Sequence, residues 1–310
     1  MKQATNTILM VRPVNFRMNE QTAVNNYFQE NLDMMNQDIN LKAQNEFDAF
    51  VNKLREKGVY VVVVEDTLDP DTPDSIFPNN WVSFHENGNV GIYPMFAENR
   101  RNERREDILE TLEEKGFLIE NIVDYTSAED EELFLEGTGS IILDREYNKA
   151  YCALSARADE ELFIEFCEDF EYTPVVFTAN QTVNGKRLPI YHTNVMMCVA
   201  DTFAVLCLDT IDDKKEKKNV LDHLKQDGKE IIPITETQMH QFAGNMLQVQ
   251  GMGGQAYLVM SSTAYNSLTP EQTKAIEKNC PIIHSSLETI ETCGGGSARC
   301  MMAEVFLPKK

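Results

Sequence analysis

A glycine-rich segment near the end of the chain places a cysteine where it could act as a nucleophile. The segment reads Cys-Gly-Gly-Gly-Ser-Ala-Arg-Cys-Met over residues 293–301, and its glycines allow a sharp turn close to a ligand. Cys300 stands beside Arg299 at the start of an apolar stretch, residues 301–307, that is predicted to be a strand. A thiol on such a turn next to a cation is typical of an exposed, reactive thiolate. The alternative is a turn before a last strand that carries an incidental cysteine.

A nucleophilic thiol needs a base and a carboxylate, and two other segments offer them. Cysteine hydrolases pair the thiol with a histidine and an orienting acid that lie far apart in the sequence. His192 comes just before an apolar strand predicted from residue 195, and Glu136 lies between apolar residues and a glycine-containing turn. A histidine bonded to a loop carbonyl and a solvated acid are the alternatives. Together, Glu136, His192 and Cys300 each lie beside a predicted strand, which indicates one site.

The composition is that of an acidic globular chain and argues against several kinds of partner. The 310 residues carry a net charge of −22 at pH 7, and the one basic cluster, residues 100–105, is interrupted by Glu103. A nucleic-acid surface needs a clustered basic face, so we expect no nucleic-acid partner. The sequence begins without the apolar core of a signal peptide and holds no apolar run long enough to span a membrane, so we expect no membrane partner.

The seven cysteines and five histidines predict neither disulfides nor a metal site. The cysteines form no Cys-x-x-Cys pair, which indicates reduced thiols and a cytoplasmic location. No histidines are spaced as His-x-x-x-His, and the interval from Cys293 to Cys300 fits no zinc pattern, so we expect no metal and no cofactor. The oligomeric state is left open, and a homodimer is compatible with the sequence.

Short strands alternate with amphipathic helices, which predicts an α/β fold in a single domain over residues 1–310. No Gly/Ser/Pro-rich linker divides the chain, and about five strand-and-helix units can be counted. Thr269 is a candidate cap, and Pro270 suits the first turn of the helix that follows. The predicted strands are 7–11, 59–64, 140–143, 150–154, 195–200, 203–208, 231–234, 246–250, 256–260, 281–284 and 301–307. The predicted helices are 40–57, 103–115, 159–170, 212–227 and 271–278.

Several motifs, in order along the chain, resemble those of the guanidine-modifying superfamily. They are Glu-Gly-Thr-Gly at 136–139, His-x-Asn at 192–194 and Gly-Gly-x-x-Ala-Arg-Cys-Met at 294–301, together with weaker matches at 73–80, 99–103 and 154–157. The superfamily includes arginine deiminases, dimethylarginine dimethylaminohydrolases and amidinotransferases. The resemblance implies the pentein fold, a five-bladed α/β propeller with pseudo-symmetric units and the active site near its central axis.

The resemblance also implies a role for each matching residue. Cys300 would attack the central carbon of an amidino or ureido group, His192 would act as general acid and base, and Glu136 would support them. Arginines would hold the carboxylate of an amino-acid substrate, as a guanidinium fork does well, and an aspartate would hold its amino group. The implied substrate-binding residues are Asp74, Asn80, Arg157 and Asn194, with either Arg100 or Arg101 as the second arginine.

Departures from the arginine deiminases point to the substrate. Those enzymes hold the cationic guanidinium with carboxylates, whereas this chain has Asn80 and Asn194 at the matching positions. A carboxylate a few Å from a cation contributes on the order of 4 kcal/mol before desolvation, and an amide can instead donate to a neutral ureido carbonyl. We therefore expect hydrolysis of citrulline to ornithine, ammonia and carbon dioxide. The chain resembles the bacterial citrulline-utilisation hydrolases in its Phe-Pro-Asn-Asn-Trp and His-Thr-Asn segments. Gly139, where relatives often have Asp, is a further departure.

Three other functions stay open on the sequence alone. An arginine or dimethylarginine deiminase would share the catalytic residues and differ in the groups that hold the substrate. An amidinotransferase would pass the amidino group to an acceptor amine. A ribosome-binding initiation factor has the same propeller without a catalytic cysteine, so the presence of Cys300 disfavours a pure binding role.

Overall fold

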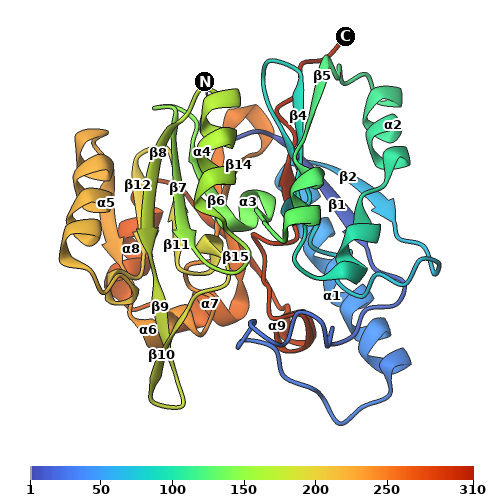
Figure 1. Cartoon of the computed structure of the whole chain (residues 1–310), viewed down its shortest axis with the longest axis horizontal. Coiled ribbons are helices and arrows are strands. Elements are labelled where there is room, and N and C mark those ends of the chain that lie inside the picture. The colour runs from blue at the N-terminus through green and yellow to red at the C-terminus, as the bar shows by residue number, and fades with distance from the viewer. Residues whose placement is uncertain (1) are drawn as a thin grey trace.

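The computed structural model describes residues 2–310, and within them five three-stranded sheets share one pattern (Figure 1). In each sheet the middle strand pairs antiparallel with one neighbour and parallel with the other. The sheets are β17 (Ala303–Glu304), β1 (Thr7–Arg12), β2 (Tyr60–Glu65); β3 (Val82–Phe84), β4 (Asn89–Ile92), β5 (Asn121–Asp124); β6 (Ile141–Asp144), β7 (Lys149–Leu154), β8 (Thr173–Thr178); β11 (Met197–Val199), β12 (Phe203–Leu206), β13 (Glu230–Pro233); and β14 (Leu247–Gln250), β15 (Ala256–Ser261), β16 (Ile282–Ser285).

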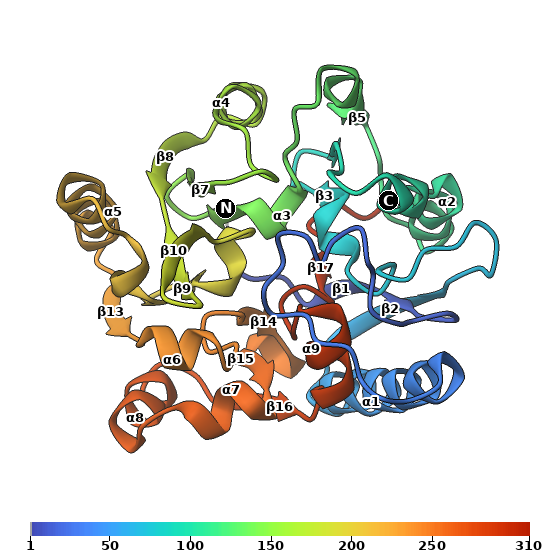
Figure 2. The same ribbon diagram turned by 60° about the horizontal axis from the view of Figure 1, so that its bottom comes forward.

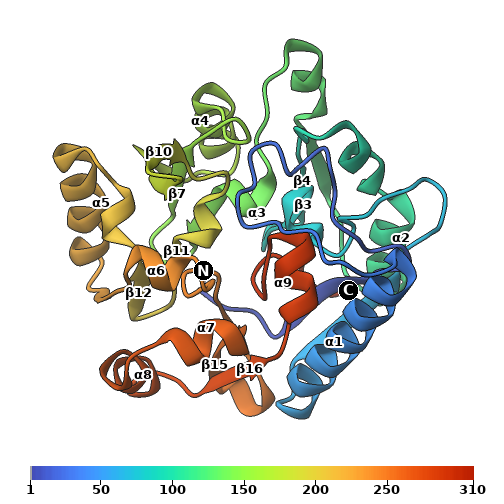
Figure 3. The same cartoon turned by 90° about the horizontal axis from the view of Figure 1, so that it is seen from below.

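A helical crossover joins the two parallel strands of every sheet, as parallel pairing requires. The crossover helices are α1 (Asn36–Glu56), α2 (Glu106–Glu114), α4 (Glu160–Asp169), α5 (Lys214–Gln226) and the pair α7 (Ser262–Ser267) and α8 (Pro270–Glu277). Figures 2 and 3 show α1, α2, α4, α5 and α8 at the rim of the molecule, with the short helices α3 (Gly137–Ser140) and α9 (Glu288–Gly294) toward its middle. A separate hairpin, β9 (Asn180–Val183) and β10 (Lys186–Pro189), and the short α6 (Glu236–Met239) complete these elements.

The helices form where the sequence pattern and the end signals agree. The α1 helix buries Phe47, Phe50 and Leu54, which recur at helical spacing. At the start of α8, Thr269 and Gln272 form a capping box and Pro270 occupies the first turn, so the predicted start of this helix is confirmed. The α/β fold class is likewise confirmed.

Short 3-10 helices of one or two turns precede several of the hairpin strands or connect other elements. They are η1 (Pro78–Asn80), η2 (Glu98–Glu103), η3 (Thr126–Glu131), η4 (Thr193–Val195), η5 (Leu208–Thr210) and η6 (Met252–Gly254). Short turns or the four-residue helix α3 stand just before β3, β6, β11, β14 and β17.

Two predicted elements differ clearly from the structure, and several elements were not predicted: the strands β3, β4, β5, β8, β9 and β10 and the short helices α3, α6, α7 and α9. The predicted strand 301–307 is strand only at Ala303–Glu304, because the chain turns through residue 301 and only these residues pair with β1. The predicted helix 103–115 begins at Glu106, because Arg100 and Glu103 turn inward in the preceding 3-10 helix and pair with each other. Helix α9 has no strong apolar period in its sequence, and it ends at Gly294 with Gly295 in the left-handed region at φ 62°.

Candidate active site

A narrow cavity of about 10 Å³, room for about one water molecule, brings together most of the predicted site residues. Its walls come from β-sheet ends and turns that are far apart in the sequence, with α9 beside it. The lining residues that the sequence predicted are Asp74, Asn80, Arg100, Arg157, His192 and Cys300. Glu136 and Asn194 do not line the cavity, but each contacts a residue that does: Glu136 bonds His192 and Asn194 bonds Cys300.

His192 and Glu136 form a buried pair. The Nε2–H of His192 donates to Oε2 of Glu136 at 2.7 Å, and Oε1 of Glu136 accepts from the backbone N–H of Phe96 at 3.0 Å. Burial alone would raise the pKa of Glu136, but Arg157, His192 and Arg100 hold it well below its usual value. Burial lowers the pKa of His192 to about 4, although Glu136 opposes this. The carboxylate is thus ionised and the imidazole neutral at pH 7, with Nδ1 free to accept a proton.

This low pKa of His192 makes the stability of the protein dependent on pH. Between the folded pKa of about 4 and the ordinary value of 6.5, the unfolded chain binds more protons than the folded one, so stability is lost as pH falls through this window. We expect the unfolding free energy to decline by about 3 kcal/mol more in the wild type than in His192→Asn between pH 6.5 and 4. Urea denaturation at several pH values measures the unfolding free energy of both proteins. If this free energy falls equally with pH in the wild type and in His192→Asn, the low pKa of His192 is contradicted.

The sulfur of Cys300 faces neutral amides. Nδ2 of Asn245 lies 3.2 Å from Sγ, and the amide of Asn194 lies 3.4 Å away through Nδ2. The prediction of an exposed thiol beside a cation is wrong on both points: Cys300 is 3% exposed, and Arg299 turns away to donate to Met302 O and to Glu304. The turn before β17 sends the two neighbouring side chains in different directions.

Asn80 is held in one orientation by Arg100. Nη1 of Arg100 lies 2.9 Å from Oδ1 of Asn80, and since a guanidinium only donates, the oxygen must face it. Nδ2 of Asn80 is buried and without a partner. It borders the same small space as Nδ1 of His192, because a Cβ at Gly139 would lie 2.3 Å from Asn80 Nδ2 and 2.9 Å from His192 Nδ1. A side chain at residue 139 and this position of Asn80 therefore exclude each other.

The two arginines left open by the sequence separate clearly. Arg100 is 2% exposed and donates to both oxygens of Glu103, at 2.8 and 2.9 Å. Burial raises the pKa of Glu103 to about 7, against the effect of Arg100. Arg101 does not line the cavity: it donates to Met95 O at 3.1 Å and lies 3.4 Å from Glu129. Only Arg100 of this pair is in a position to contact a bound molecule.

Residues 13–35, here the covering segment, close the cavity. The remaining predicted residues are bonded to it: Asp74 accepts from Asn19 at 2.8 Å, and Nη2 of Arg157 donates to Thr22 O at 2.9 Å. Asn26 donates to the carbonyl oxygens of residues 294 and 295, next to α9. Oδ1 of Asp74 is buried and unpartnered, and burial raises the pKa of this carboxyl. Entry of a substrate requires these bonds to open.

Asn245 is a site residue that sequence reasoning missed. Its flanks, Gly244 and Met246, carry no motif, and the residue lies outside all the segments that resembled known ones. One signal could have found it: like Asn80 and Asn194, it stands two or three residues before an apolar strand that begins an antiparallel pair.

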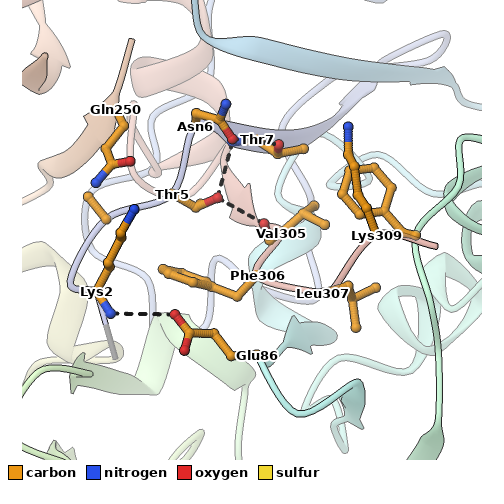
Figure 4. Close-up of a pocket in the computed structure, with 12 residues that line it drawn as sticks. Lys2, Thr5, Asn6, Thr7, Glu86, Gln250, Val305, Phe306, Leu307 and Lys309 are labelled. Atoms are coloured by element: carbon orange, nitrogen blue, oxygen red, sulfur yellow. Dashed lines mark hydrogen bonds between the residues drawn. The ribbon is translucent and has the colours of Figure 1, made fainter. Parts of the chain in front are cut away.

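A wider hollow of about 260 Å³ lies where the first and last residues of the described chain meet (Figure 4). Its polar groups are mutually bonded: Lys2 N donates to Glu86 and Thr5 donates to Val305 O, while Lys309 lies over the rings of Tyr60 and Phe117. None of the predicted site residues lines it. Elsewhere in residues 2–310, no cluster of potential metal ligands is found, and no helix has the length and apolar character to cross a membrane.

Comparisons with known proteins agree with this arrangement. A sequence model of the family described as N,N dimethylarginine dimethylhydrolase, eukaryotic, matches residues 12–307. No curated protein sequence matches the chain. Among solved structures, ArgZ, an arginine dihydrolase from the ornithine-ammonia cycle in cyanobacteria, is 16% identical with a TM-score of 0.75 over 98% of this chain. The chain spans 41% of that protein. The N-terminal domain of ArgZ has also been solved separately, as a cysteine-to-serine variant bound to substrate. It is 16% identical with a TM-score of 0.70, over 97% of this chain and 99% of that domain.

A second kind of solved structure is also similar. A histidine variant of dimethylarginine dimethylaminohydrolase, in an adduct with S-methyl-L-thiocitrulline, is 15% identical with a TM-score of 0.65, over 96% of this chain and 98% of that one. At such identities the likeness establishes the fold, whereas the family follows from the sequence match.

Proposed function

The chain belongs to the family of N,N dimethylarginine dimethylhydrolases, and on that basis we propose that it hydrolyses the ureido group of citrulline to ornithine, ammonia and carbon dioxide. The family places the chain among the enzymes of the guanidine-modifying superfamily that hydrolyse carbon–nitrogen bonds. The choice of a ureido substrate within that class rests on the residues of this site.

One observation carries the proposal: the free group of Asn80 is a donor. Arg100 takes the oxygen of this amide, so the unpartnered Nδ2 faces the space beside His192. A guanidinium has only N–H groups and would leave that donor unpaired in a buried site, which costs about 1–3 kcal/mol. A ureido carbonyl oxygen accepts the hydrogen bond. Asn194, also neutral, adds no negative charge near Cys300 that would favour a cation.

The proposed reaction uses one water molecule. Nδ1 of His192 takes the thiol proton as Cys300 attacks the ureido carbon and forms a carbon–sulfur bond, and the carbonyl electron pair moves to oxygen. The adduct collapses as His192 protonates the departing amine, and water activated by Nδ1 of His192 then cleaves the carbon–sulfur bond. The carbamic acid that leaves decomposes to carbon dioxide and the second amine. Glu136 holds the imidazole and stabilises it while it is charged.

We propose that the substrate's α-carboxylate is bound by Arg157, with Arg100 nearby, and its amino group by Asp74. Arg157 now donates to Thr22 O and Asn25, and Asp74 keeps one oxygen free. Opening of the covering segment would release Arg157 for the carboxylate. The five three-stranded sheets would be the blades of a single-domain five-bladed propeller with this site at its centre.

A second candidate is an arginine dihydrolase, which removes both guanidino nitrogens and so also ends at ornithine. It is favoured by the fold shared with ArgZ, and by the buried, unpartnered Oδ1 of Asp74 beside the ionised Glu136, two carboxyl groups that a cationic substrate would use. Such an enzyme would form citrulline on the way, and the amide of Asn80 would serve its second step.

A product assay on the purified protein separates these functions. Citrulline, arginine, agmatine and dimethylarginine are offered separately, each with and without an acceptor amine. Ornithine and ammonia from citrulline alone support the proposal, and ornithine from arginine as well supports the dihydrolase. Citrulline that accumulates from arginine or dimethylarginine means a deiminase, and turnover that depends on the acceptor amine means an amidinotransferase.

The seven free, buried cysteines fit the proposed cytoplasmic location.

Gly139→Ala is expected to reduce turnover by at least about 100-fold, because the new methyl would displace Asn80 and His192, and displacements of about 1 Å at a catalytic site have effects of this size. Both side chains are held by other bonds and cannot yield freely. In the double variant with Asn80→Ala, the closest of these contacts is removed while the contact with His192 stays, so the melting temperature should recover in part while turnover stays low. Normal turnover in the single variant would show that Asn80 is mobile.

A further inference from the structure

Within the described structure, two side chains are hydrogen-bonded to the sulfur of Cys300, those of Asn245 and Asn194. Asn245 is the nearer of the two. The residue is fully buried, two positions before β14, on a sheet that contributes none of the predicted site residues. We infer that Asn245 is a catalytic residue, which donates a hydrogen bond to the Cys300 thiolate and keeps it poised for attack. The inference deepens the proposed function. Its statement about the substrate rests on that function, whereas its statement about the reactivity of the Cys300 thiol does not.

The direction of the hydrogen bond follows from the other contacts of this amide. Oδ1 of Asn245 accepts from the backbone N–H of Arg299 at 2.9 Å, and a backbone N–H can only donate. The opposite side of the amide is therefore nitrogen. Nδ2 also donates to Asn194 O at 3.0 Å, which leaves its second hydrogen for Sγ at 3.2 Å. Asn194, by contrast, approaches Sγ with both ends, 3.4 Å through nitrogen and 3.7 Å through oxygen, so only Asn245 is fixed as a donor.

A donor is needed here because, within residues 2–310, the side chains bonded to the sulfur are neutral amides and none is a cation. Arg299 is bonded to Met302 O and Glu304, and His192 is neutral, since burial lowers its pKa to about 4. A cationic guanidinium substrate would itself stabilise a nearby thiolate, whereas a neutral ureido substrate brings no charge. For the proposed substrate class, the stabilisation must come from the protein, and neutral hydrogen-bond donors supply it.

The predicted effect is on the ionisation of Cys300. A hydrogen bond to a charged group contributes enough to shift an ionisation midpoint by about one pH unit or more. The test is the rate at which iodoacetamide labels Cys300, measured by mass spectrometry across pH. In Asn245→Leu the labelling midpoint is expected about one pH unit higher than in the wild type. The value of kcat/KM should fall at neutral pH and recover above the new midpoint, which a merely misfolded site would not do.

The control is Gln181→Leu, which removes another fully buried amide, in β9 and away from the cavity. Its labelling midpoint should match the wild type. Asn245→Ala removes the amide without adding a bulky side chain, and it replaces Asn245→Leu in the test if the leucine variant fails to fold. An unchanged midpoint in either folded variant overturns the inference. Labelling needs no substrate, so a shifted midpoint without citrulline turnover would leave Asn245 in place and overturn only the proposed function.

Discussion

Cys300→Ala is expected to lower kcat/KM for citrulline by at least about 10⁴-fold while the fold is kept, because loss of the nucleophile removes the covalent route altogether. The side chain packs in a turn whose other contacts, through Arg299 N and the residues around Gly296, do not need the sulfur. Turnover is followed by ornithine and ammonia release, and folding by circular dichroism and the melting temperature.

The matched control for this variant is Cys293→Ala. Cys293 is also buried, stands seven residues earlier at the end of α9, and is not part of the cavity wall. Its replacement should change turnover by less than about threefold, since its sulfur lies away from the reacting atoms. A haloacetamidine should label Cys300 quickly and Cys293 slowly. Full activity in Cys300→Ala would remove the covalent mechanism, and activity lost only in Cys293→Ala would move the nucleophile.

Asn80→Asp is expected to shift the ratio of kcat/KM for arginine over citrulline by at least about 100-fold toward arginine. Arg100 would keep one carboxylate oxygen, and the other would replace the free Nδ2 beside His192. A carboxylate a few Å from a guanidinium gains on the order of 4 kcal/mol before desolvation, and the same change removes the donor for a ureido oxygen. Competition between the two substrates in one assay measures the ratio directly.

Asn79→Asp is the matched control for this substitution. Asn79 is equally buried and adjacent in sequence, but it bonds Thr138 and does not line the cavity. A buried charge at residue 79 should lower the melting temperature and leave the substrate ratio unchanged. If folded Asn80→Asp keeps the parental order of substrates, the neutral amides do not select the ureido group.

Much of the fold could be predicted because the strands are strongly apolar and the helices have clear ends. The strand near residues 7–11 is buried along its length and the one near 59–64 is rich in valine, while Thr269 and Pro270 predict the start of α8. The predictions failed where tertiary contacts decide. Residues 301–307 look like one strand, but β1 offers partners only to Ala303 and Glu304, and α9 holds few apolar residues of its own.

The candidate site was predictable where a residue carries a motif and not where it only supports one. His192, Glu136 and Cys300 stand in segments that resemble known ones, whereas Asn245 is a lone amide in an apolar stretch. The orientation of Asn80 depends on Arg100, and the need for Gly139 depends on Asn80, so neither follows from local sequence. The direction of Arg299 likewise depends on Glu304, which draws the guanidinium away from the sulfur.

The pairing of β17 with β1 joins nearly the two extremes of the described chain, with Ile8 opposite Glu304. Cys300 lies just before β17, so it reaches its place only when β17 pairs with β1. Contacts between residues so distant in sequence form slowly, because a long loop must close before they are made. The position of the proposed nucleophile therefore depends on a pairing between residues far apart in the sequence, and the proposed site is complete only after this long-range closure.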